Sequence, residues 1–274
     1  MKLIKEKSCA EFNIITNKKL YKLSLMIKAI FKNSLNKPNI LINANSNFLP
    51  LAYFIKEYAN VKVVKNSLHG IFSFITHFGC YDLGLFCEKQ NSKCVVKFYS
   101  GSGYVLCPTV FSILERENQK EFTYKKYNKI KLYSSNFDFK NEKLDLFCKR
   151  WINNYCLFYK NKIINKPNCL VVLKNKNEQY LINKINAIKN TARFKLILSE
   201  NNIKLYKNGE QISINKILNK NCAKALQFNE YLMFKNAIEL NKDVVECNKN
   251  FFVTKDAFTF ENISLVVYIL NNLL

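Results

Sequence analysis

The chain has 274 residues, 49% of them hydrophobic and 14% aromatic, so it can bury a sizeable core as one large domain or two joined ones. This composition excludes a disordered chain, a collagen-like chain and a small disulfide-bonded scaffold. Lys and Arg number 43 against 20 Asp and Glu, a net charge of +23 that is typical of proteins that bind nucleic acid or anionic membranes.

Helical and strand patterns alternate along the chain. Helical spacing of apolar residues is found at 19–31, 51–58, 71–78, 144–159, 179–188 and 228–240. Short apolar runs predict strands at 11–16, 39–43, 61–64, 110–115, 122–124, 130–133, 169–173, 194–198, 203–206 and 251–254. Residues 94–98 fit a strand or a helix end, and residues 258–260 and 264–270 fit strands or a strand followed by a helix. This mixture predicts an α+β fold in two lobes, residues 1–138 and 139–274.

The charge has a second explanation besides a polyanionic partner. The lysines are spread over the whole length among Asn, Ile, Phe and Tyr, while Arg116, Arg150 and Arg193 are the only arginines. Mutational bias in an AT-rich genome produces that pattern without selection for nucleic-acid binding.

The ten cysteines form no zinc motif, because no two are spaced as Cys-x-x-Cys and only His69 and His77 could assist them. Free thiols in a reducing compartment are therefore expected. The first residues are charged, and no window has the 18 or more apolar residues of a membrane span. We expect a cytoplasmic protein with no membrane segment and no metal held by its own side chains.

Two loops carry residue types suited to phosphate. Asn66, Ser67 and Gly70 lie just before or within the start of the predicted helix 71–78, where backbone N–H groups and the helix dipole attract anions. Ser100 and Ser102 lie in the Gly-Ser-Gly turn at residues 100–103, which lets a ligand approach the backbone closely. An ordinary helix cap and an ordinary turn are the alternatives.

The order of four short segments resembles the diphosphomevalonate decarboxylases of the GHMP small-molecule kinase superfamily. The segments read SNFLP at 46–50, NSLHG at 66–70, GSG at 101–103 with ILER at 113–116, and AFTFE at 257–261. The resemblance implies a GHMP-kinase-like fold, with a ribosomal-protein-like N-terminal lobe and a ferredoxin-like C-terminal lobe. It also implies a homodimer that uses ATP and Mg²⁺ to decarboxylate mevalonate 5-diphosphate to isopentenyl diphosphate in isoprenoid and sterol biosynthesis.

The same resemblance assigns roles to individual residues. Asn66, Ser67 and Gly70 would bind the nucleotide phosphates, and Glu261 would be the catalytic carboxylate in place of the family's aspartate, unless it is a solvated residue at a strand end. The substrate diphosphate would be bound by Asn47, Ser100 and Ser102. The family's lysine-bearing first strands have no counterpart, and Cys107 stands where the family has an arginine. A degenerate paralogue that keeps the fold as a dimer partner and has lost catalysis is therefore a further alternative.

A basic module that binds RNA or DNA is the alternative from a different class. Aromatic and basic residues interleave in one segment, namely Tyr124, Lys125, Lys126, Tyr127, Lys129, Lys131 and Tyr133. Rings would stack on bases while ammonium groups meet phosphates. An edge strand kept soluble by lysine gives the same pattern.

Overall fold

The structure is a computed structural model of residues 1–274. It describes all of them except 6–7, 91, 104, 128–131, 140–143, 165–167, 187–191, 200–201, 214–222, 228–242, 248–249, 255–261, 272 and 274. The chain divides into two compact units, one of Met1–Ser67 with Phe72–Asp138 and one of Leu68–Ile71 with Phe139–Leu274. Each unit is described by itself.

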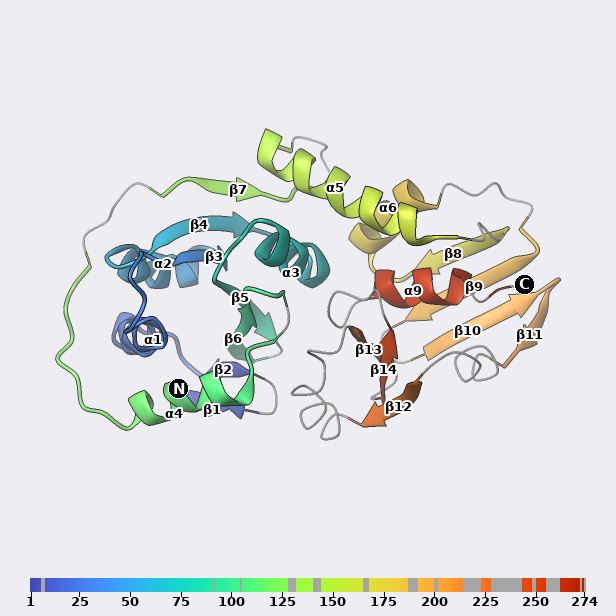
Figure 1. The fold of residues 1–274 in the computed structure, drawn as a ribbon. Coiled ribbons are helices and arrows are strands. Elements are labelled where there is room, and N and C mark those ends of the chain that lie inside the picture. Colours follow the sequence, from blue (N-terminus) through green and yellow to red (C-terminus); the bar gives the residue numbers. More distant parts are fainter. Residues whose placement is uncertain are drawn as a thin grey trace. The chain divides into compact units, whose positions relative to one another are not determined.

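A seven-stranded mixed sheet forms the centre of the first unit (Figure 1). Its strands, in spatial order, are β1 (Lys2–Ile4), β2 (Cys9–Phe12), β6 (Lys93–Ser100), β5 (Leu83–Gln90), β3 (Asn39–Asn43), β4 (Asn60–Lys65) and β7 (Ser134–Asn136). The last four run parallel to one another, and the first three pair antiparallel with their neighbours. Strand β3 reads NILIN and its last four residues are buried, as expected for a parallel strand that is covered on both faces.

Helices cover both faces of this sheet. Their bounds are α1 (Asn17–Ile30), the 3₁₀ helix η2 (Ser46–Phe48), α2 (Leu49–Lys56), α3 (His69–Phe78) and α4 (Pro108–Asn118). The crossover from β3 to β4 and the one from β4 back to β5 lead in opposite directions along the sheet, so right-handed connections place α2 and α3 on opposite faces. Figure 1 shows α1, α2 and α4 on one side and α3 on the other.

The core of the first unit lies mainly between the sheet and α1, α2 and α4. It joins Leu23 and Ile27 of α1, Ile55 of α2 and Phe111 of α4 to the buried side chains of β3 and β6. Thr16 caps α1 by accepting a hydrogen bond from the Lys19 amide, and Pro108 begins α4 at a position where its missing N–H costs nothing.

The second unit has two smaller sheets. In one, β8 (Cys169–Leu173) lies parallel to β9 (Phe194–Ser199), followed in order by the antiparallel strands β10 (Asn202–Lys207) and β11 (Glu210–Ile212). The other contains β12 (Ala223–Gln227), β14 (Asn250–Thr254) and β13 (Asp243–Cys247) in that order. The helices are α5 (Leu146–Lys162), α6 (Lys176–Ile185) and α9 (Asn262–Asn271). Asn208 and Gly209 both have positive φ, at 51° and 89°, as the two-residue turn from β10 to β11 requires.

The sequence predicts many of these elements, but it gives no prediction for β1, β5, β7, β11, β12 and β13, and some of its predictions are wrong. Residues 110–115 are helical rather than extended, because Phe111 and Leu114, three residues apart, are the buried side chains of α4. Residues 122–124 belong to no strand. Residues 94–98 lie in β6 and residues 264–270 in α9, which settles both open assignments. Residues 228–240, 258–260 and 130–131 lie outside the described residues, and residues 132–133 belong to no strand.

The chain is a mixed α and β protein. Among the helices that the structure describes, none has the length and apolar content to cross a bilayer.

Gly84 sets how closely α3 approaches the sheet. A Cβ atom at this position of β5 would lie 2.7 Å from Thr76 Oγ1 and 2.8 Å from Phe72 Cε1, both on α3. Any larger residue must therefore displace these two side chains or the helix that carries them.

We expect Gly84→Ala to lower the free energy of unfolding by about 1–3 kcal/mol, the usual cost of overpacking a core. Urea denaturation measures this. In a Thr76→Ala background the nearest obstructing atom is gone, and the Thr76 hydroxyl donates only to the Phe72 carbonyl of its own helix, so the penalty should shrink. Equal penalties in the two backgrounds would contradict the close approach.

Candidate functional site

The carboxyl ends of β3 and β4 form a topological switch point in the parallel part of the sheet. The chain leaves β3 toward η2 and α2 on one face, and it leaves β4 toward α3 on the other. Open α/β sheets bind ligands at such points, because neighbouring loops that diverge leave polar backbone and side chains at the strand ends.

Asn43 connects the two diverging loops. Its side chain is 7% exposed, its Oδ1 accepts a hydrogen bond from the Ser67 amide at 3.2 Å, and its Nδ2 donates to the Cys87 carbonyl at 3.4 Å. One buried amide thus joins the end of β3 to the loop after β4 and to β5. The sequence led us to expect that the Ser67 N–H binds a phosphate, but this group donates its hydrogen bond to Asn43.

Further amide side chains line the same edge. Asn66 has a left-handed backbone with φ 55°, and its Nδ2 donates to Asn136 Oδ1 at 2.8 Å, at the end of β7. Asn45 begins η2 by accepting a hydrogen bond from the Asn47 amide at 3.1 Å, and both side chains are exposed. Lys65, half-buried, is the last residue of β4.

The structure brings Asn47, Asn66 and Ser67 to this edge, while Gly70 is buried in the first turn of α3. Asn43 and Asn136 are not predicted from the sequence. Their contacts with Ser67 and Asn66 depend on the order of strands in the sheet. The available signal is an asparagine directly after an apolar strand pattern.

The Gly-Ser-Gly turn lies at the opposite edge of the sheet. Ser100 pairs with Leu83 at the amino end of β5, whereas Asn43 pairs with Phe86, three residues further along that strand. A rise of about 3.3 Å per residue separates the two edges by roughly 10 Å at least along the strand. Asn66 and Ser67 therefore lie at one edge of the sheet, and Ser100 and Ser102 lie at the other.

The turn at residues 100–103 packs on the later part of α3. The Gly103 amide donates to the Ser100 carbonyl at 2.8 Å, Ser73 Oγ donates to the Gly103 carbonyl, and His77 Nδ1 lies 3.3 Å from the Gly101 carbonyl oxygen. The hydroxyls of Ser100 and Ser102 are 2.7 Å apart and bond to each other. Glu261, the expected catalytic carboxylate, lies outside the described residues.

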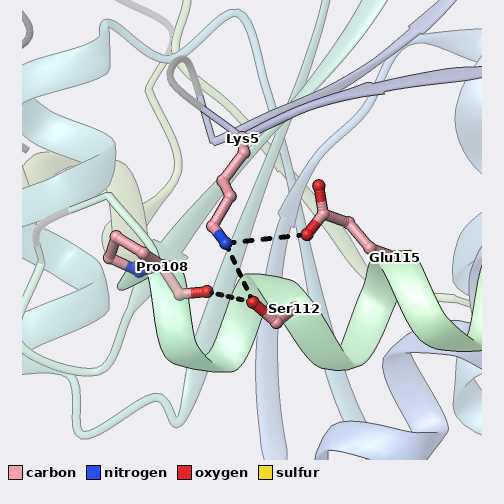
Figure 2. A network of polar contacts seen from close by, with 4 residues as sticks. All are labelled: Lys5, Pro108, Ser112 and Glu115. Carbon is pink, nitrogen blue, oxygen red and sulfur yellow. Dashed lines mark hydrogen bonds and ion pairs between the residues drawn. The ribbon is translucent and has the colours of Figure 1, made fainter.

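Figure 2 shows a serine beside a lysine, a pair that could suggest a nucleophile and its base. Lys5 Nζ donates to Ser112 Oγ at 3.0 Å and lies 3.7 Å from Glu115 Oε2. The Ser112 hydroxyl itself donates to the Pro108 carbonyl at 2.9 Å, so its proton is not directed at the lysine. The network holds the segment after β1 against α4. It does not activate the Ser112 hydroxyl as a nucleophile.

Two tyrosines of the lysine-rich segment, Tyr124 and Tyr127, pack on the core. Tyr124 makes edge contacts with Tyr21 and Phe54, with ring centroids 5.6 and 6.4 Å apart, and Tyr127 stacks on Tyr53 at 5.2 Å. These rings contact protein, which leaves Lys125 and Lys126 exposed between them. Lys129 and Lys131 lie outside the described residues, and Tyr133 is 75% exposed.

In the described part of the chain, no three His, Cys, Asp or Glu side chains gather as a metal site would require. The thiols there are free, and several are buried. Burial raises the pKa of Cys156 to about 11 and that of Cys169 to about 12, and it also raises the pKa of Cys87 well above its ordinary value.

No family model and no curated protein matches the chain. Among solved structures it is similar to a phosphoglucomutase/phosphomannomutase family protein from Burkholderia thailandensis, with a TM-score of 0.49 and 8% sequence identity. The match covers 89% of this chain and spans 61% of the length of that protein.

This finding corrects the resemblance to the diphosphomevalonate decarboxylases. The similar structure belongs to a fold family other than the GHMP kinases, so the GHMP resemblance is wrong. Its motifs are three to five residues long, and in the fold two of them lie at opposite edges of one sheet. ATP, Mg²⁺, the homodimer and the decarboxylation of mevalonate 5-diphosphate depended on that resemblance and are untested.

We expect thiol alkylation to separate the described cysteines sharply. Cys80 is exposed, whereas Cys156 and Cys169 are buried, with raised pKa values that leave no more than about 0.1% thiolate at pH 8. Iodoacetamide should label Cys80 quickly and the two buried thiols only after urea unfolds the chain, as read by peptide mass spectrometry. Labelling of Cys156 or Cys169 at the rate of Cys80 in native protein would contradict the burial.

Proposed function

We propose that the protein binds a small phosphate ester at the carboxyl edge of the seven-stranded sheet, between β3 and β4. The observation that carries this proposal is the Asn43 amide, which joins two loops that diverge to opposite faces at a switch point. A buried polar side chain at that place fixes the loop geometry, and a binding site needs fixed geometry.

The chemistry of the edge favours an anion over a cation. The loops at residues 44–48 and 66–67 contain asparagine and serine and no acidic residue, and Lys65 precedes the second loop. Amide and hydroxyl groups donate hydrogen bonds to phosphate oxygens, and the amides can also accept hydrogen bonds from hydroxyls of the rest of the ligand. The net charge of +23 attracts any anion, so it supports association without locating the site.

Asn66→Asp tests the location with little disturbance of the fold. Asp tolerates the left-handed backbone of Asn66, and Asn136 can rotate its amide to donate the hydrogen bond that it now accepts. The substitution adds a negative charge at the proposed site. Ser102→Asp adds the same charge on an exposed residue at the opposite edge and is the matched control.

Isothermal titration calorimetry with inorganic phosphate, glycerol 3-phosphate and ATP at constant ionic strength should find at least one saturable site per chain. We expect Asn66→Asp to weaken that binding about tenfold and Ser102→Asp to change it less than about twofold, because a like charge acts strongly only at short range. The absence of saturable binding, or equal weakening by both variants, would sink the proposal.

A further inference from the structure

A depression of about 540 Å³ lies at the carboxyl end of α1, away from the edge discussed above. Its walls come from the last turns of α1, the segment 31–38, Tyr58 and Glu117 of α4. Pro38 precedes the first residue of β3, so the depression lies toward the amino edge of the sheet. Its volume is in the range of pockets that hold small organic ligands.

The floor of the depression is apolar and fixed. Leu25 and Ala29 of α1, Phe31 and Pro38 line it together with Tyr58. The Tyr58 hydroxyl donates to the Ser24 carbonyl at 2.7 Å, and burial raises its pKa, so the ring is neutral and held in place. Such a floor suits an aliphatic or aromatic body of a ligand.

The rim carries an excess of positive charge. Lys28, Lys32 and Lys37 line the depression and are exposed, and Lys28 Nζ lies 5.8 Å from the centre of the Tyr58 ring. Within the described part of the chain, no ion pair or hydrogen bond involves the ammonium group of Lys32 or Lys37.

The negative charges near the rim do not cancel that excess. Glu117 is the one acidic residue of the lining, and its carboxylate already binds Lys120 at 2.7 Å and lies 4.0 Å from Arg116 Nε. The exposed Glu57 is outside the lining, but its carboxylate adds to the effect of burial in raising the pKa of Tyr58. The carboxyl end of α1 adds about half a negative charge. Two of its last carbonyls are bonded to the amides of Phe31 and Lys32.

We propose that this depression binds an amphiphilic anion, with an apolar body on the Tyr58 floor and a carboxylate, sulfonate or phosphate head among Lys28, Lys32 and Lys37. The geometry joins the two requirements of such a ligand in one place, an apolar surface and an adjacent cluster of ammonium groups, and the one carboxylate of the lining, Glu117, is bound to Lys120. A neutral ligand would leave the lysines unused, and a small inorganic anion would leave the floor unused.

The fluorescent probe 8-anilinonaphthalene-1-sulfonate has both parts and reports the polarity of its surroundings. Titration of the full chain should show one saturable site. The double variant Lys32→Gln with Lys37→Gln should raise the dissociation constant about fivefold or more, while Lys125→Gln with Lys126→Gln, which removes the same charge from exposed positions elsewhere, should change it less than twofold. Ala29→Trp should abolish the signal by filling the floor with the charges intact.

Competition then identifies the ligand class. Octanoate should displace the probe, and octanol at the same concentration should not, because it lacks the anionic head. The proposal is overturned if both lysine pairs weaken the probe equally, if neither does, or if octanol competes as well as octanoate. Thermal unfolding of each variant checks that it is folded, and Asn66→Asp should leave probe binding unchanged, which separates this site from the one at the carboxyl edge.

Discussion

The burial of β3 on both faces is the constraint on which the first unit depends. Four consecutive residues of this strand are buried, so neither face can meet water, and helices must cover both. The chain meets this need with α2 before β4 and α3 after it, on opposite sides. The same change of side creates the switch point at the carboxyl ends, so the buried strand β3 and the polar loops at this edge of the sheet have one cause.

Elements with a strong local pattern can be predicted from this sequence, and elements defined by their neighbours cannot. The apolar run NILIN, the helical spacing before Phe78 and the Asn-Gly turn at residues 208–209 each carry their own signal. Residues 110–115 read as a strand because their apolar residues are nearly continuous, and only the packing of Phe111 and Leu114 on the core reveals the helix.

Local sequence patterns reveal only part of the candidate sites as well. Asn66 and Ser67 can be singled out because they precede an apolar helix. Asn43 gains its role only from the parallel pairing of β3 with β4, which no local pattern reveals. Short motifs such as GSG and NSLHG match a family in order and spacing, yet order along the chain does not bring two loops to one edge of a sheet. The lysines of the α1 depression are equally hidden, since they are three among many in a lysine-rich chain.

The aromatic segment 121–127 has a consequence for how the first unit opens. It belongs to no helix or strand, and Phe122, Tyr124 and Tyr127 hold it on the core by ring contacts with α1 and α2. It can therefore detach locally without breaking any hydrogen-bond ladder of the sheet, and its detachment exposes the aromatic side chains of α1 and α2 that it covers. Lys125 and Lys126 are exposed between these rings, so the outer side of the attached segment is charged while its inner side is aromatic.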